Sequence, residues 1–322
     1  MPLPLFILIA FLLLTLVSGA YIFIIACAKR KDIDWLDEQV VSKTPNAQYY
    51  EFMVASDKWL KEHKAQDVYT TGADGVPLHA LWIPVSNSKG TVLMAHGYRS
   101  TMLLDFHLAF ELFHRLGMNI LVPEQRTHGQ SGGRFITFGV KESADMHCWI
   151  RCHNRTLSCG PMILYGISMG ASTMLYLADR KLPTNVKGII ADCGFTSPAQ
   201  IISSVYRSVL HIPPLLSVWA AGLFARVFAG FSIWKSDSRK SLAATRLPVL
   251  LIHGEADGFV PCEMTKQAYE ACTGKKALLL VKDAEHGLSF LFDGLRYTAM
   301  VIDFLKENIP GFDLPGNTQE SQ

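Results

Sequence analysis

A serine between two glycines joins a strand-like segment to a helix-like one, and this arrangement restricts the fold of the chain more than any other feature. Residues 161–165 (PMILY) are apolar and are typical of a buried strand, whereas residues 171–178 (ASTMLYLA) favour a helix. The pentapeptide GISMG, residues 166–170, fills the turn between them. A strand, G-x-S-x-G and a helix in this order hold the serine on a sharp turn with its hydroxyl exposed. Ser168 is therefore the predicted nucleophile.

Short apolar segments alternate with helical patterns on both sides of this turn. Such alternation favours a mostly parallel sheet with helices on both faces, an α/β fold. Two consecutive strands around the turn at residues 72–75 predict an antiparallel hairpin at one edge. The expected strands are residues 68–71, 76–83, 91–95, 119–122, 162–165, 186–191, 249–252 and 277–281.

The N-terminus predicts a membrane anchor. No charged residue occurs between Leu3 and Ala28, and about 20 apolar residues suffice to cross a hydrocarbon core. A cleaved signal peptide would carry a basic segment before a shorter apolar run. A lipoprotein processing site ending at Cys27 is a further alternative, but it too would need that basic segment. Lys29, Arg30 and Lys31 follow the span, so the positive-inside rule places the catalytic domain on the cytoplasmic side of the cell membrane.

Composition narrows the functional classes. The chain has 322 residues, of which 49% are hydrophobic, and its net charge is +2 without a long basic tract. Nothing in this pattern indicates nucleic-acid binding. The seven cysteines are unevenly spaced and give no disulfide framework, in agreement with a reducing compartment.

Residues 196–245 contain no strand pattern and interrupt the alternation. One amphipathic helix and one more apolar helix are expected there, separated by Pro213-Pro214. A second membrane span over residues 209–225 is disfavoured by the proline pair and by His211. The segment is predicted to be a helical cap inserted over the active site, whose apolar underside is either plain core or the wall of an acyl-chain pocket.

An activated serine needs a base and an acid that orients the base. Asp257 follows the predicted strand 249–252, and His286 follows the strand 277–281. The carboxyl ends of parallel strands lie at one edge of a sheet, so both loops should meet Ser168. Glu255 and Asp283 are the alternatives to Asp257. His96, His128 and His253 are the alternatives to His286, and loop hydrogen bonding is the preferred role for these three.

An acyl-transfer site also needs donors for the tetrahedral oxyanion. The N–H of Met169 at the start of the helix is one predicted donor, and the N–H of Tyr98 in the loop after residues 91–95 is the other. Glycines are expected where backbones approach closely, in the elbow and in that loop. These glycines are Gly97, Gly166 and Gly170.

With these pieces the chain resembles the α/β-hydrolase superfamily, in which nucleophile, acid and base follow this order. Within it, the chain is similar to a bacterial membrane-anchored branch related to monoacylglycerol lipases and serine aminopeptidases. The resemblance implies an eight-stranded, mostly parallel sheet flanked by helices, and it spans residues 67–308. Glu124-Gln125 precede Arg126 where the family usually has Asp. The matching motifs are His96-Gly97-Tyr98, residues 126–131 (RTHGQS), 166–170, 192–195 (DCGF), 253–261 and His286-Gly287.

The predicted organisation is a transmembrane anchor (residues 1–28), a juxtamembrane helical connector (29–65), a hydrolase domain (66–309, with its cap at 196–245) and a flexible tail (310–322). His147, Cys148, Cys152, His153 and Cys159 lack the spacing of a metal site and are expected to be ordinary helix residues.

The predicted function is a membrane-anchored serine hydrolase that cleaves a small-molecule or lipid-like carboxylic ester through Ser168, His286 and Asp257, with no metal or organic cofactor. A serine peptidase or an acyltransferase would use the same three residues. An aminopeptidase would be expected to hold a substrate amine with acidic cap residues, of which only Asp237 stands out. A non-catalytic binding protein of the same fold is the remaining alternative. The natural substrate and the oligomeric state are not specified by the sequence.

Overall fold

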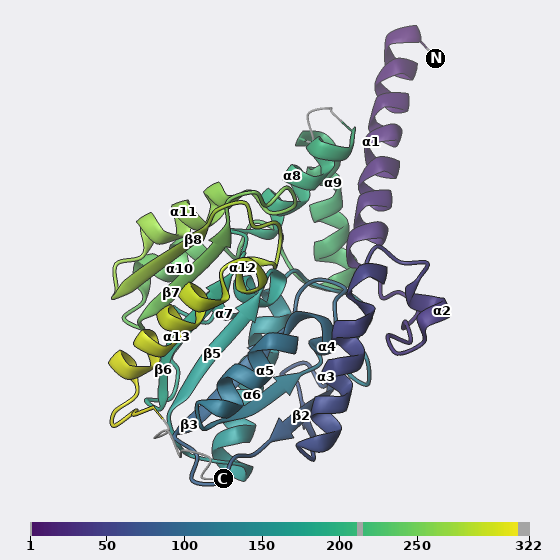
Figure 1. Cartoon of the computed structure of the whole chain (residues 1–322). Helices are drawn as coiled ribbons and strands as arrows, with labels where there is room; N and C mark the ends of the chain where they lie inside the picture. The colour runs from purple at the N-terminus through teal and green to yellow at the C-terminus, as the bar shows by residue number, and fades with distance from the viewer. Residues whose placement is uncertain (1, 211–214, 315–322) are drawn as a thin grey trace.

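An eight-stranded sheet crosses the body of the protein in the computed structural model, which describes residues 2–210 and 215–314 (Figure 1). Two of the predicted features lie outside these residues: the Pro213-Pro214 break and, in the tail, residues 315–322. In the order in which they pair, the strands are β1 (Gln66–Thr71), β2 (Pro77–Ile83), β4 (Met118–Pro123), β3 (Gly90–Ala95), β5 (Met162–Ile167), β6 (Val186–Asp192), β7 (Val249–Gly254) and β8 (Lys276–Val281).

The sheet is mostly parallel, as predicted. Only β2 runs against its two neighbours, β1 and β4, whereas β4, β3, β5, β6, β7 and β8 pair in parallel. The central strands are buried along their whole length, which explains why they are continuous apolar runs in the sequence. The α/β-hydrolase-like architecture expected from the sequence is thereby confirmed.

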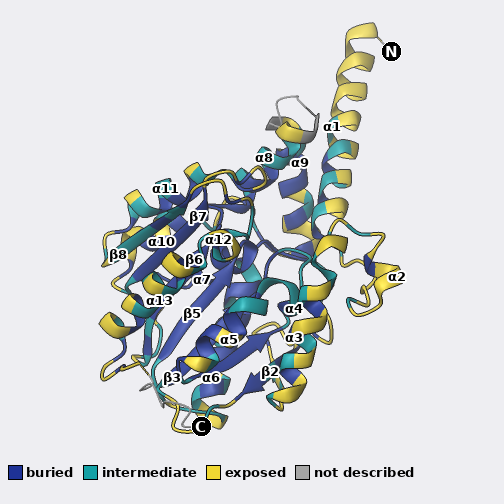
Figure 2. Cartoon of the chain, in the orientation of Figure 1, coloured by how far each residue is buried: buried dark blue, intermediate teal, exposed yellow. Residues whose placement is uncertain are grey.

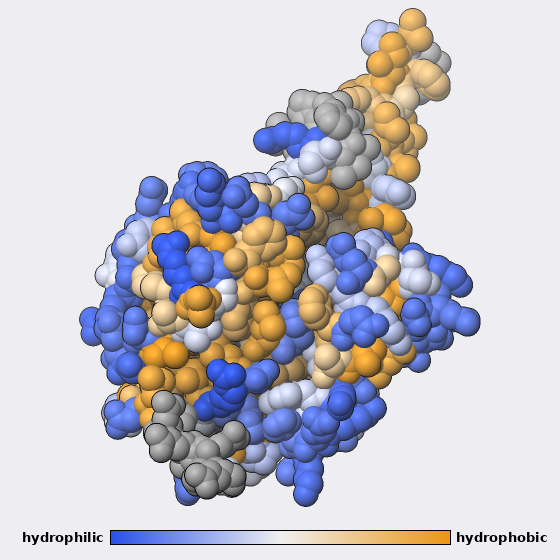
Figure 3. Space-filling model, in the orientation of Figure 1, coloured by the Kyte–Doolittle hydropathy of each residue, from blue (hydrophilic) through white to orange (hydrophobic). Residues whose placement is uncertain are grey.

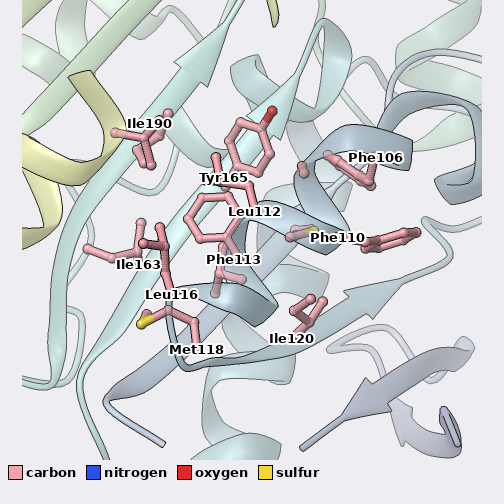
Figure 4. Packing of buried hydrophobic residues seen from close by; sticks show 14 of the residues in the cluster. Phe106, Phe110, Leu112, Phe113, Leu116, Met118, Ile120, Ile163, Tyr165 and Ile190 are labelled. Atoms are coloured by element: carbon pink, nitrogen blue, oxygen red, sulfur yellow. The ribbon is translucent and has the colours of Figure 1, made fainter. Parts of the chain in front are cut away.

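Alternate residues of each strand enter two separate cores, one on each face of the sheet. On β5, Ile163 and Tyr165 face a core that also contains Phe106, Phe110 and Phe113, and Figure 4 shows these rings packed together. Met162 and Leu164 face the opposite core. Both cores appear as buried layers under the surrounding helices in Figure 2.

Helices cover both faces of the sheet. The predicted helix over residues 102–116 is divided at Phe106 into two shorter helices, and the predicted helix over 141–152 is longer than expected. On one face lie α3 (Tyr50–Glu62), α4 (Met102–Asp105), α5 (His107–Arg115), α12 (Ser289–Phe292) and α13 (Gly294–Asn308), and on the other α6 (Val140–Thr156), α7 (Met169–Leu175), α10 (Ser238–Ala244) and α11 (Cys262–Ala271).

The N-terminal helix α1 (Leu3–Cys27) projects from this body (Figure 1) and most of its residues are exposed. Among the described residues it is the one helix long and apolar enough to cross a membrane. The connector after it is only partly helical: residues 29–36 form no helix, and α2 (Glu38–Val41) and the 3₁₀ turn η1 (Ala47–Tyr49) are short. Asp37 begins α2 by accepting a bond from the N–H of Gln39.

The segment predicted as a cap contains α8 (Pro198–Leu210), α9 (Leu215–Phe224) and a π-helical turn, η2 (Ala225–Ala229), followed by α10. Its apolar underside is packed against Phe138, Met169 and Phe195 and against Phe23 of α1. The sequence allowed two interpretations of this underside, plain core or the wall of an acyl-chain pocket. The structure shows core packing.

Candidate active site

Ser168 lies at the tip of the turn between β5 and α7. Its backbone has a φ of 56° and a ψ of −119°, a conformation that non-glycine residues rarely adopt. The N–H of Ser168 donates to the Asp192 carbonyl (2.8 Å), which ties the turn to β6. A Cβ on Gly166 would overlap the backbone of Gly170, and one on Gly170 would overlap the Ala95 carbonyl. The tight turn thus depends on glycine at both positions.

His286 makes a hydrogen bond from each of its ring nitrogens. Its Nε2 lies 2.9 Å from Ser168 Oγ, and its Nδ1 lies 2.6 Å from Asp257 Oδ2. The three residues come from loops after β5, β7 and β8, so the structure brings the predicted nucleophile, base and acid together at one edge of the sheet. With the Nδ1 proton held by the carboxylate, the Nε2 lone pair faces the serine hydroxyl.

Asp257 is buried and fully occupied by donors. Its Oδ1 accepts the N–H groups of Phe259 and Val260, both at 2.8 Å. Burial alone would raise the pKa of Asp257, but the hydrogen bonds from His253 and His286 outweigh it and hold the pKa of this carboxyl well below its usual range. The group is therefore an anion throughout the neutral range, as an orienting acid must be.

The three alternative histidines form hydrogen bonds within their own loops or to neighbouring ones. His96 bonds the Gly97 carbonyl (2.9 Å) and accepts the N–H of Gln125 (3.0 Å), and burial, together with the nearby His128, lowers its pKa to about 3. His128 bonds the Arg126 carbonyl (3.0 Å). His253 contacts the Thr265 hydroxyl (2.6 Å) and the Val260 carbonyl (3.0 Å), while its Nε2 also lies 3.1 Å from Asp257.

The loop after β3 carries the predicted oxyanion donor. The N–H of Gly97 donates to Asp105 Oδ2 (2.6 Å), so this group is occupied. Within residues 2–210 and 215–314, the N–H groups of Tyr98 and Met169 have no hydrogen-bond acceptor. Gly97 packs closely, because a Cβ on it would lie 3.3 Å from Ser168 Cβ. Both predicted donors therefore have N–H groups that are free to bind an oxyanion.

Two side chains that sequence reasoning missed hold this loop. Asp105 also accepts from the Ser100 hydroxyl (2.5 Å), and its pKa is raised by burial. Arg99, whose φ is 53°, donates to the carbonyls of Ile25 (2.6 Å) and Ala28 (3.3 Å) at the end of α1. No local sequence pattern marks either residue, because each forms its contacts through the tertiary fold. Asp105 binds the loop from α4, and Arg99 binds the end of α1.

Cys193, Asp257 and His286 place one potential metal-ligand atom each within 4.8 Å of one another. The donor set fits a metal poorly. Burial, with the neighbouring Asp192 and Asp257 carboxylates, raises the pKa of the Cys193 thiol well above its usual value, so the ligand form is disfavoured. In the same set, Asp257 and His286 are bonded to each other. The helix cysteines Cys148 and Cys152 belong to no such group in the described part of the chain.

A cavity of about 230 Å³ opens beside Ser168. It adjoins a cleft of about 1240 Å³ that separates the connector from the hydrolase body, and Tyr98, Arg99 and Phe259 border both. Among the described residues of the 196–245 segment, none lines either space. The connector lines the small cavity instead, at Asn46, Tyr49 and Phe52. The predicted cap therefore does not cover the cavity beside Ser168. Its apolar face packs instead against the hydrolase body and α1.

Comparisons with known proteins identify relatives of this chain. A family model described as "Serine aminopeptidase, S33" matches residues 86–242. YqkD of Bacillus subtilis is 28% identical over 236 residues, which cover 72% of this chain and 76% of that protein. YNL320W of Saccharomyces cerevisiae, described as an uncharacterized membrane protein, is 26% identical over 73% of this chain and 77% of its own length.

The solved structure of the esterase Pf2001 from Pyrococcus furiosus shares the fold, with a TM-score of 0.63 at 24% identity over 78% of this chain and 95% of the esterase. The sheet, the serine turn and these matches define an α/β-hydrolase. The chain belongs to the α/β-hydrolase superfamily.

Proposed function

We propose that the protein is a serine hydrolase that cleaves a carboxylic ester through an acyl-enzyme and is held at a membrane by α1. The single observation that supports this most is the position of His286, whose ring bridges Ser168 and Asp257 at 2.9 and 2.6 Å. A serine hydroxyl in contact with a histidine that is itself oriented by a buried carboxylate has the geometry of an activated nucleophile.

In the first half-reaction Ser168 Oγ bonds to the ester carbonyl carbon while its proton passes to His286 Nε2. Asp257 stabilises the imidazolium that forms. The negative charge on the former carbonyl oxygen is received by the free N–H groups of Met169 and Tyr98. When this intermediate collapses, the bond to the alcohol oxygen breaks and His286 returns its proton to the leaving alkoxide.

In the second half-reaction a water molecule attacks the acyl carbon of the acyl-enzyme. His286 takes a proton from the water, the oxyanion forms again at the same two N–H groups, and Ser168 leaves with the proton. The result is a carboxylic acid and a free serine. The chemistry requires no group beyond the residues of this chain.

The surroundings of Ser168 favour an ester with an apolar acyl group. Phe52, Leu104 and Leu291 line the small cavity, which opens into the larger cleft on the side of the connector. The described esterase neighbour agrees with ester chemistry, and the yeast relative named as a membrane protein agrees with an anchor. We propose a lipid-like ester as the substrate class, with the catalytic domain on the cytoplasmic side.

An aminopeptidase would hold the substrate's free amine with a carboxylate. Asp237, the acidic residue singled out in the cap, instead accepts the N–H of Arg239 at the start of α10 and pairs with the Arg239 guanidinium at 2.7 Å. This carboxylate is therefore already engaged. The family-model match keeps peptide cleavage as the second candidate, and amide and ester substrates of matched acyl group distinguish the two.

Labelling with a fluorophosphonate probe tests the proposal. Wild type should be labelled and Ser168→Ala should not, because the probe bonds to the activated serine oxygen. Labelling that persists in the variant would refute the assignment. Hydrolysis of p-nitrophenyl esters from acetate to palmitate then tests the substrate class, and activity confined to the shortest esters would remove the lipid-like ester.

A further inference from the structure

We propose that α9 lies in the membrane beside α1, with η2 at the headgroups, so that the cap is a second point of contact with the lipid bilayer. The proposal rests on the proposed anchoring by α1, and it extends it to a segment too short to span a membrane. The proposed partner of the exposed face of α9 is the hydrocarbon of the bilayer. Helix α9 enters it from the side of the membrane on which the hydrolase body lies.

The helices α1 and α9 lie side by side over the half of α1 nearest the body (Figure 1). The hydroxyls of Ser18 and Ser217 are 2.5 Å apart, and the rings of Phe23 and Phe224 stack at 6.4 Å. A Cβ on Gly19 would overlap Ala220, so the two backbones approach closely at that point. Because the contacts advance together along both chains, α9 runs parallel to α1.

This packing fixes how deep α9 must lie. At 1.5 Å per residue, the 25 residues of α1 measure about 37 Å, against a hydrocarbon thickness of about 30 Å. At most about 7 Å of an upright α1 can then remain outside the hydrocarbon on the side of the body. Ser217 lies at the level of Ser18, which is about 14 Å above Cys27. The N-terminal half of α9 therefore lies within the hydrocarbon layer, at whatever height along α1 that layer is centred.

The face of α9 that points away from α1 and the body is suited to lipid. Leu216, Trp219 and Leu223 of α9 and Val227 of η2 follow one another at helical spacing, and all are exposed. Trp219 is 58% exposed and Val227 65%. Figure 3 shows the apolar surface of α1 continuing down to the level of α9. A continuous apolar surface like this one would be unusual on a face in contact with water.

The polar groups of the segment agree with this placement. No ionisable side chain occurs from Leu215 to Ala225, and the hydroxyls of Ser18 and Ser217 satisfy each other between the helices. Small residues at the contact and hydroxyl bonds across it are typical of helix pairs in membranes. Arg226 is exposed in η2, just past the end of α9, where a headgroup would meet it. Arg207 is exposed in the last turn of α8, near the level of Ser217, because the Tyr206 hydroxyl lies 3.4 Å from the Ser217 hydroxyl. Its long side chain must therefore extend to the headgroups.

Tryptophan quenching tests the depth of α9 in the full-length protein. Wild type, Trp219→Phe and Trp59→Phe are reconstituted in phosphatidylcholine vesicles with or without bromine on the acyl chains. Bromolipid should quench the emission that Trp219 contributes, which is the difference between wild type and Trp219→Phe. The contribution of Trp59, which stacks on Phe110 in the hydrolase body, should be unaffected.

The result that overturns the proposal is a Trp219 contribution insensitive to bromolipid, whether it is quenched by aqueous iodide or is shielded from both quenchers by a second protein surface. Membrane residence is measured separately by sedimentation of the vesicles after alkaline carbonate extraction. Protein lost in that extraction contradicts anchoring by α1, whereas protein retained with an unquenched Trp219 contradicts only the insertion of α9.

Discussion

The phenolic hydroxyl of Tyr98 donates a hydrogen bond of 2.9 Å to the main-chain carbonyl of Ala26, so the last turn of α1 holds the residue whose N–H is the proposed oxyanion donor. The neighbouring Arg99 binds the carbonyls of Ile25 and Ala28 in the same turn. The helix C-terminus favours this positive charge. The proposed membrane anchor is consequently also in contact with the loop of the proposed active site.

Replacing Tyr98 with Phe should lower kcat while leaving KM nearly unchanged. The ring remains in its stack with Phe138, but the loop loses one hydrogen bond, worth about 1 kcal/mol or about five-fold in rate. Steady-state kinetics with a soluble p-nitrophenyl ester measures the effect. Tyr69→Phe is the matched control, because its hydroxyl bonds Gln130 at the surface and its rate should equal that of wild type. An unchanged kcat in Tyr98→Phe would show that the loop keeps its position without α1.

Asp257→Asn should reduce kcat by about 10³–10⁴-fold, because an amide donates where the carboxylate accepts and no longer fixes the tautomer of His286. Glu255→Gln and Asp283→Asn serve as controls in the loops that follow β7 and β8, and both should retain wild-type activity. The ester assay decides between the three acids. Full activity in Asp257→Asn, or its loss in either control, would transfer the role to another carboxylate.

Gly170→Ala should prevent folding or destabilise the protein by more than about 3 kcal/mol, since its Cβ would collide with the Ala95 carbonyl in the neighbouring strand. Gly258→Ala adds the same methyl group in open space and should shift the melting temperature by no more than a degree or two. Thermal unfolding of the detergent-solubilised chain compares them. Equal melting temperatures would contradict the close approach of the two backbones.

Asp192→Asn should become more stable relative to wild type as the pH rises from 4 to 7. Burial raises the pKa of Asp192 to about 6, against about 3.9 for an exposed aspartate. Between these values the folded protein binds more protons than the unfolded chain, so the contribution of this group to the free energy of unfolding falls as pH increases. The gain for the neutral variant is at most about 3 kcal/mol.

Melting curves at several pH values measure this effect, with the exposed Asp303→Asn as the control. The Asn oxygen can still accept from the Ser289 hydroxyl, which lies 3.2 Å from Asp192, so the substitution keeps that hydrogen bond. Parallel pH profiles for wild type and Asp192→Asn would mean that the pKa of Asp192 is not raised in the folded protein.

The sequence was sufficient to predict the fold and to select residues that lie together, and the reason is topological. Ser168, Asp257 and His286 each follow a strand, and parallel strands deliver their following loops to one edge. The contacts of Asp105 and Arg99 could not be predicted in this way, because helix α4 and the end of α1 reach the loop through tertiary packing. Likewise, the apolar pattern of residues 196–245 shows that a face is buried but not which surface buries it.

One wall of the Ser168 cavity is formed by Asn46, Tyr49 and Phe52, which belong to the stretch of chain that joins α1 to the hydrolase body. If α1 is the membrane anchor, as proposed, the segment that follows it also borders the proposed substrate site. A shortened enzyme that begins at β1 would lack that wall and would be expected to accept a broader range of esters than the full-length protein. Substrate preferences measured on such a fragment would therefore not apply to the full-length protein.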